Sequence, residues 1–184
     1  MIGLTLAVIA VASCGGDGGG AAQPAAGSFQ RVIATDRVFS VDDAVAAGAK
    51  KSKQYDATGL SGATDAWLAF FGSDASSRKE FELRFYPSHE AAVKEGTPLA
   101  EEGVGEGMKA KKDAQTWTEG AKNRWRAGGV TDVSSPGSRQ APGPKFGDYA
   151  IYGNLVMLCE GADSGQSLER CAGLIEAMGG PKAK

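Results

Sequence analysis

Alternation of apolar and polar positions predicts three β-strand regions along the chain. The clearest spans residues 80–86 (EFELRFY), where apolar residues take the odd positions, the pattern of a strand with one face in water. The aromatic run 66–71 favours a second strand, paired with the first as a hairpin. Residues 148–160 form the third region. Its Gly153-Asn154 pair suits either a two-residue hairpin turn or a bulge, and we expect one long strand.

Apolar residues at helical spacing, together with capping residues, predict five helices. The first follows a capping box made by Ser40 and Asp43. Ser88 caps a second helix that we expect to stop at Gly96, and Pro98 suits the first turn of a third. A fourth would place Trp117 on one face, and the last carries a continuous apolar stripe. The predicted helices span 41–49, 89–95, 97–102, 113–126 and 166–178.

This order of elements predicts a single α+β domain over residues 29–184. An antiparallel sheet of three to four strands with helices packed on one face fits best, and a ferredoxin-like arrangement is compatible with it. Residues 128–147 contain five glycines and three prolines, so we expect a long, flexible, irregular loop there.

Composition narrows the class of protein. The 184 residues are 42% hydrophobic and 23% charged, as in ordinary folded soluble domains, which argues against disorder and against a polytopic membrane protein. The formal net charge of -2 provides no strong positive field, so no nucleic-acid partner is expected.

The first residues have the pattern of a secretion signal. Residues 1–12 (MIGLTLAVIAVA) are uncharged and almost wholly apolar, too short to span a bilayer but suited to the apolar region of a signal peptide. Small residues then precede Cys14. The string Val11-Ala12-Ser13-Cys14 resembles the lipobox of bacterial lipoprotein precursors. Unlike most signal peptides, it has no Lys or Arg ahead of it.

This resemblance implies that residues 1–13 are a cleaved signal peptide and that Cys14 is diacylated, often with acylation of the new amino terminus. Residues 14–28, rich in glycine, would form a lipidated tether to the cell membrane, facing the extracytoplasmic side. The alternative is a buried apolar amino-terminal helix with an incidental cysteine.

Two cysteines remain, Cys159 at the end of a predicted strand and Cys171 on the last predicted helix. A strand followed by a helix folds back on itself, and a domain outside the cytoplasm keeps disulfides, so we expect these two to be bonded. The alternative is a pair of free, buried thiols.

The sequence offers no cluster of catalytic residues. His89 is the single histidine and adjoins Ser88, but a nucleophile and its base converge from separate elements, so a surface histidine is expected. Neither a metal site nor a cofactor motif is predicted. The acidic pairs Asp42-Asp43 and Glu101-Glu102 suit solvated helix surface.

Basic residues interleave with tryptophans in the fourth predicted helix. A binding surface formed by Trp117, Trp125, Arg124 and Arg126 would suit envelope polymers or anionic headgroups better than single-stranded nucleic acid. The alternative is a helix whose tryptophans pack on the sheet while its charges face water.

Residues 67–96 and 149–179 look like small bacterial lipoproteins of unknown function, through EFELRFYPSHEAAVKEG, DYAIYGNLVMLCEG and a final amphipathic helix. This resemblance implies an α+β extracytoplasmic domain and carries no activity. We therefore expect a membrane-anchored, non-enzymatic binding or accessory module of the cell envelope, whose partner is a protein, a polymer or a small ligand. Two alternatives are a hydrolase of an envelope polymer that uses acidic residues and a soluble subunit of a transport or assembly complex.

Overall fold

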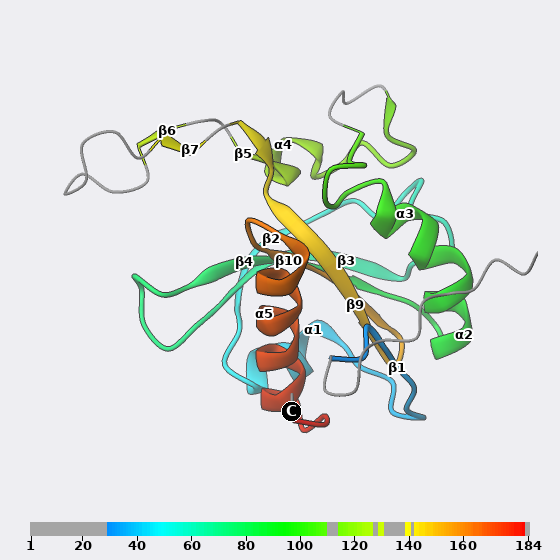
Figure 1. Ribbon diagram of the computed structural model, residues 1–184. Coiled ribbons are helices and arrows are strands. Elements are labelled where there is room, and N and C mark those ends of the chain that lie inside the picture. The colour runs from blue at the N-terminus through cyan, green and yellow to red at the C-terminus, as the bar shows by residue number, and fades with distance from the viewer. Residues whose placement is uncertain (1–28, 110–113, 127–128, 131–138, 141, 183–184) are drawn as a thin grey trace, which may run out of the picture.

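A computed structural model describes residues 29–109, 114–126, 129–130, 139–140 and 142–182. Its centre is a mixed six-stranded sheet with the order β1-β9-β10-β4-β3-β2 (Figure 1). Neighbouring strands are antiparallel except β1 and β9, which run parallel. The strands are β1 (Val32–Ile33), β2 (Lys50–Gln54), β3 (Asp65–Phe71), β4 (Lys79–Phe85), β9 (Phe146–Tyr152) and β10 (Leu155–Glu160). The α+β class is confirmed. The prediction of three to four strands was too low, and a ferredoxin-like arrangement is not confirmed.

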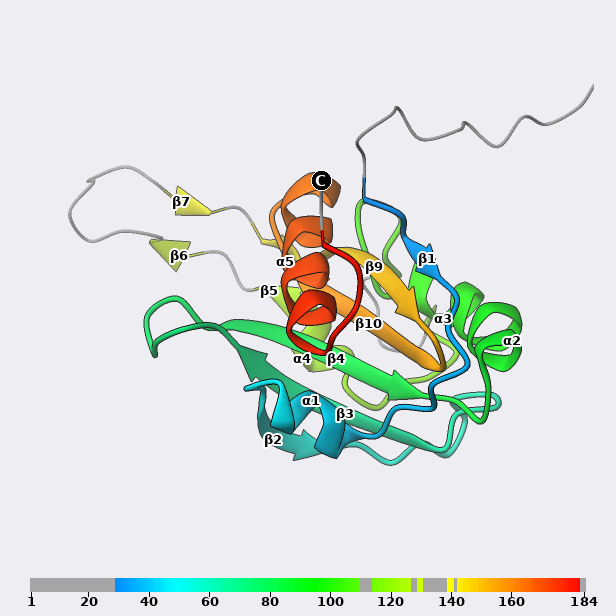
Figure 2. The same ribbon diagram turned by 90° about the horizontal axis from the view of Figure 1, so that it is seen from below.

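Helices cover both faces of this sheet, which corrects the prediction that they pack on one face (Figure 2). On the first face, α1 (Val41–Ala46) and α5 (Ser164–Ala177) pack against apolar residues of β4, β9 and β10. On the second face, the short helices α2 (His89–Ala91), η1 (Ala92–Gly96) and α3 (Thr97–Glu101) cover β9 and β10. The segment around Trp117 covers β3 on that second face.

Strand β4 is therefore buried on both sides, although its alternating sequence predicts one face in water. Phe81 and Leu83 belong to the core beneath α5, as the alternation predicts. Glu82 and Arg84 point to the other face and are only 0% and 1% exposed. Charged side chains on a buried face need partners, and these partners form the site described below.

The third β region is a hairpin, not the single long strand that we expected. Strands β9 and β10 pair in register around a turn at Gly153-Asn154, with Gly153 at φ +56°. The buried Asn154 amide accepts a hydrogen bond from the Phe39 N–H at 2.6 Å and donates to the carbonyls of Phe39 and Tyr86. These bonds hold the turn against two other segments, which alternation alone does not encode.

The first helix follows its predicted cap, and the last follows a cap that we did not predict. At α1 the Asp43 carboxylate accepts the Ser40 N–H at 2.8 Å, as the capping box predicts. Helix α5 begins after Asp163, whose carboxylate accepts the Gln166 N–H at 2.8 Å.

The glycine at position 96 does not end the second helix. The chain passes through Gly96 in a π-helical turn that joins α2 to α3. A Cβ on this glycine would lie 2.7 Å from the Val156 Cγ2 atom and 3.0 Å from the Tyr86 ring. Close packing on the sheet, and not helix termination, explains glycine at this position.

The predicted helix 113–126 is mostly wrong, since among the described residues of this range only α4 (Ala121–Arg124) is α-helical. Residues 128, 131–138 and 141 of the predicted loop 128–147 lie outside the described residues. Its described part contains short strands: β5 (Trp125–Arg126) pairs with β8 (Gly143–Pro144), and β6 (Gly129–Val130) with β7 (Arg139–Gln140). Within the described ranges, no helix is long and apolar enough to cross a membrane.

Candidate functional site

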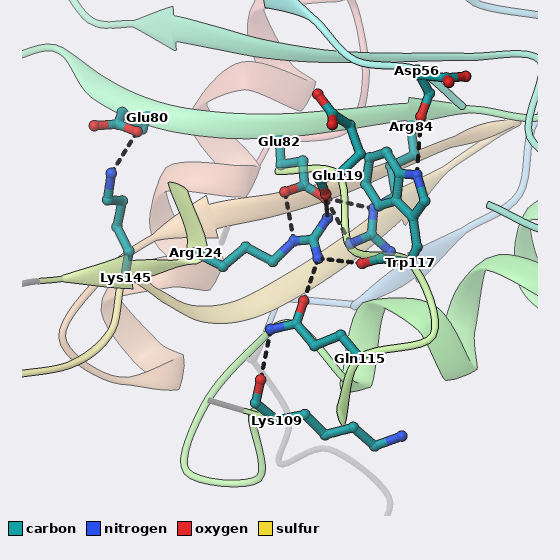
Figure 3. A network of polar contacts seen from close by, with 10 residues as sticks. All are labelled: Asp56, Glu80, Glu82, Arg84, Lys109, Gln115, Trp117, Glu119, Arg124 and Lys145. Carbon is teal, nitrogen blue, oxygen red and sulfur yellow. Dashed lines mark hydrogen bonds and ion pairs between the residues drawn. The ribbon is translucent and has the colours of Figure 1, made fainter. Parts of the chain in front are cut away.

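The most unusual group of side chains is a cluster of three charged residues inside the domain (Figure 3). Glu82 and Arg84 extend from β4, and Arg124 enters from the end of α4. The Glu82 carboxylate lies 2.6 Å from Arg84 Nη2, accepts the Arg84 Nε–H at 2.8 Å and accepts the Arg124 Nε–H at 2.8 Å. One carboxylate thus bridges two guanidinium groups, the charge-assisted geometry that makes strong hydrogen bonds.

The segment 115–120 closes over this cluster. Arg124 donates to the Gln115 side chain at 2.6 Å and to the carbonyls of Trp117 and Glu119. Both guanidinium carbons lie over the Trp117 ring, at 5.2 Å for Arg84 and 4.7 Å for Arg124. Trp117 is itself held by a hydrogen bond from its indole N–H to a backbone carbonyl. The carbonyls replace water around Arg124, and the aromatic face covers both cations.

A glycine allows the approach of Arg124. Gly120 has φ +74° just before α4, a conformation that side-chain-bearing residues rarely adopt. A Cβ there would lie 3.1 Å from the Tyr55 ring and 3.3 Å from the Arg124 Nη2 atom. The turn therefore brings the backbone close enough for Arg124 to reach Glu82.

The cluster carries a formal charge of +1, from two guanidinium groups and one carboxylate. Burial raises the pKa of Glu82, but the positive charges of Arg124 and Arg84 outweigh it and hold that pKa below its usual value. Burial also raises the pKa of Tyr86 on the same face, so its hydroxyl stays neutral. Because the cluster is buried, it can fix the segment 115–126 to the sheet but presents no group to a ligand.

This burial corrects the predicted binding surface. Trp117 and Arg124 are 3% and 2% exposed and belong to the interior, so neither belongs to such a surface. Trp125 is 38% exposed on β5, and its neighbour Arg126 is half-buried and donates to the Lys145 carbonyl. The expectation that the charges of this segment face water was likewise wrong for Arg124. No sequence signal connects Arg124 with Glu82, because forty-two residues separate them.

The disulfide that we predicted is present. Cys159 on β10 and Cys171 on α5 are bonded, with their Cα atoms 5.7 Å apart and both residues fully buried. The bond fastens α5 to the centre of the sheet. Cys14, the predicted lipidation site, lies outside the described residues.

His89 lines a small hollow beside the β9–β10 turn, where Asn154 also contributes to the lining. Its Nδ1 atom lies 2.9 Å from the Gly153 carbonyl oxygen, and the residue is half-buried, which corrects the expectation of a surface histidine. The hollow encloses about 240 Å³ and includes Arg37 and Ser88. The Ser88 hydroxyl accepts the Ala91 N–H as a helix cap, so it is not paired with His89 as nucleophile and base.

The acidic pairs are engaged in structural contacts. Asp43 is held by the Ser40 N–H, which lowers its pKa together with Arg37. Burial raises the pKa of Glu102, but hydrogen bonds from Lys109 and Thr116 hold it below its usual value. In the described part of the chain, no group of three or more His, Cys, Asp or Glu residues is placed to hold a metal ion.

Comparison with known proteins identifies the domain. A model of a family of unknown function (DUF6810) matches residues 40–180. The chain belongs to this family. No curated protein and no solved structure matches it. The matched range contains five strands of the central sheet, the Glu82 cluster and the disulfide, so all three lie within the family domain.

Proposed function

We propose that this protein is a membrane-anchored extracytoplasmic lipoprotein that acts as a non-enzymatic binding or accessory module of the cell envelope. The observation that carries the proposal is the buried bond between Cys159 and Cys171. Cytosolic thiols are kept reduced, whereas domains exported from the cytoplasm form and keep such bonds. A disulfide at the centre of the core therefore favours an exported domain.

The anchor part of the proposal rests on the sequence around Cys14. An apolar run followed by Val11-Ala12-Ser13-Cys14 supplies an acylation site, and the glycine-rich residues after it supply a tether. Stable anchoring takes two membrane signals, which a diacylated cysteine provides. The domain would then stand on the extracytoplasmic side of the cell membrane.

The binding role rests on the kind of surface that the domain presents. In the acidic pairs, Asp42, Asp43 and Glu102 form ion pairs and Glu101 accepts a hydrogen bond from Tyr149, so these carboxylates do not favour the hydrolase alternative. No observation on the described residues favours a subunit of a transport or assembly complex. A small, disulfide-braced domain with shallow hollows suits the recognition of a ligand or partner.

Metabolic labelling tests the anchor directly. Cells that express the full-length chain are grown with an alkyne analogue of palmitate, and the label is detected on the purified protein. We expect labelling of the native chain and of Ser13→Ala, which keeps a small residue before the cysteine, and no labelling of Cys14→Ser. An unlabelled native chain that retains residues 1–13, with free thiols at Cys159 and Cys171, would overturn the proposal.

A further inference from the structure

A second hollow lies where the turn between β3 and β4 meets α5. This turn projects from the body of the sheet (Figure 1). The space encloses about 300 Å³ and is lined mainly by apolar surface. We call it the hairpin hollow; its lining includes Phe71, Phe81, Lys79, Arg170, Ser73 and Ser77.

Two aromatic rings form an apolar corner in the hairpin hollow. The rings of Phe71 and Phe81 meet edge to face, with centroids 6.1 Å apart and an angle of 81° between their planes. Phe81 is buried against the core, while Phe71 is only partly covered. Because Phe71 lines the hollow and is partly exposed, it can contact an apolar or aromatic ligand, and a third ring would pack favourably there.

Two cations flank this corner. Lys79 is directly opposite Phe71 in the β3–β4 register, and its side chain lies on the same face of the sheet as Phe81. Arg170 approaches from α5, where its Nη1 donates to the Glu160 carbonyl oxygen at 2.6 Å. Within the described ranges, neither Lys79 nor Arg170 forms a salt bridge with a carboxylate.

Two carboxylates on the same segments, those of Asp74 and Glu160, accept hydrogen bonds from other groups. Asp74, in the turn itself, accepts hydrogen bonds from the hydroxyl and backbone of Ser76 and from Ser77, and these bonds lower its pKa strongly. The Glu160 carboxylate accepts the Glu80 N–H at 2.8 Å. Because neither Lys79 nor Arg170 forms a salt bridge among the described residues, both can pair with an external anion.

We propose that the hairpin hollow binds a small organic carboxylate with an aromatic or compact apolar body. The ring of the ligand would stack on Phe71, while its carboxylate would lie between Lys79 and Arg170. The volume is at the lower limit of small-molecule sites, which suits a ligand of about ten non-hydrogen atoms. This assignment deepens the proposed binding role and rests on that role for its biological meaning. The binding itself does not involve the lipid anchor.

Fluorine NMR of 4-fluorophenylacetate with the full-length chain tests the site. We expect line broadening that saturates with a Kd of about 1 mM, typical of so small a ligand. The neutral 4-fluorophenylacetamide has the same ring but no charge, and we expect it to bind roughly tenfold more weakly. Acetate, which lacks the ring, should not displace the probe at equal concentration.

Variants locate the binding. Lys79→Gln and Arg170→Gln should each raise the Kd of the probe about five- to tenfold, whereas Lys94→Gln, an exposed lysine on η1, should leave it unchanged. Phe71→Ala should weaken binding of the probe. It should lower the temperature of unfolding by less than the truncation of a fully buried core residue would. Equal binding of the amide, or Kd values unchanged in both cation variants, would overturn the assignment. So would absence of broadening at about 20 mM probe, well above the expected Kd.

Failure of this assignment and failure of the proposed function are distinguishable. Probe binding is measured on the full-length chain whether or not Cys14 is acylated, and palmitate labelling is measured without any ligand. If the chain is labelled by palmitate but does not bind the probe, the proposed anchor stands and the proposed site at the hairpin hollow fails. If the chain binds the probe but is never labelled, the proposed site stands and the proposed anchor fails.

Discussion

Replacement of Glu82 by glutamine tests the central role of the buried cluster. Among the described residues, Glu82 is the only hydrogen-bond acceptor of Arg84, whose Nη1 atom has no partner. Glutamine keeps the size of the side chain but removes its charge and turns one oxygen into a donor. Two guanidinium groups would then remain buried without a counter-charge.

The magnitude follows from the burial of all three side chains. Removing one partner of a buried ion pair costs about 3–5 kcal/mol, because the remaining charge is left uncompensated. With a urea m-value of about 2 kcal/mol/M, a loss of about 4 kcal/mol lowers the midpoint of unfolding by about 2 M. That is a large fraction of the 5–15 kcal/mol that stabilises a typical domain.

Urea unfolding followed by tryptophan fluorescence measures this loss, since Trp117 lies over the cluster. Glu80→Gln is the matched control: Glu80 lies two residues earlier on the same face of β4 and pairs with Lys145 at 2.7 Å in a half-buried setting. Because solvent screens that pair, we expect the control to lose no more than about 1 kcal/mol.

Acid adds a second readout. The pKa of Glu82 is lower in the folded protein than in the unfolded chain, so its stabilising contribution is present above the unfolded value of about 4.3 and is lost as the pH falls towards the folded value. The stability difference between the native chain and Glu82→Gln should therefore shrink below about pH 4. A loss in Glu82→Gln no larger than that of the control, or a difference that does not change with acid, would refute the reasoning.

Four further variants test the packing of the fold. Joint replacement of Cys159 and Cys171 by alanine should cost about 3 kcal/mol, from the entropy of the short loop that the bond closes, and a reducing agent should destabilise the native chain but not this variant. Gly173→Ala in α5 should stabilise the fold by about 0.5–1 kcal/mol, because nothing lies within 4 Å of the new Cβ. Gly96→Ala should destabilise it by about 1–3 kcal/mol, because the new Cβ would press on β10. Thermal unfolding that ranks the two variants in the opposite order would contradict the packing described here. Asn154→Ala should cost about 2–4 kcal/mol in urea unfolding, since it leaves buried backbone groups of two segments unpaired, and a loss below about 0.5 kcal/mol would show that the turn does not depend on this amide.

Much of the fold is visible in the periodicity of the chain. The alternation of residues 80–86 predicted β4, and the capping box of Ser40 and Asp43 predicted α1. The positions of Cys159 and Cys171 predicted their bond. Strand β2 was missed because its lysine-rich sequence is exposed at every position and shows no alternation. The β9–β10 turn was missed because it depends on contacts of Asn154 with distant segments.

The buried cluster was only partly foreseeable. Glu82 and Arg84, two residues apart on one strand, are opposite charges on one face, which suggests an ion pair. Arg124 reaches them through the left-handed turn at Gly120, and its alternation with tryptophans looked like an exposed basic surface. From the local sequence pattern alone, a charged side chain is predicted to face water. Whether it is buried depends on elements that are far apart in the sequence.

The two edges of the sheet bear on how copies of this domain behave when they are crowded together. An unpaired strand edge can recruit the same edge of a neighbouring molecule and begin a chain of pairings. Here β1 offers only two residues, and β2 displays Lys50, Lys51 and Lys53 along an exposed strand. The lysine charges of β2 repel an identical strand that approaches it, and the two-residue edge of β1 offers too few backbone hydrogen bonds to hold another strand. Even at high density on a surface, the domain should stay dispersed.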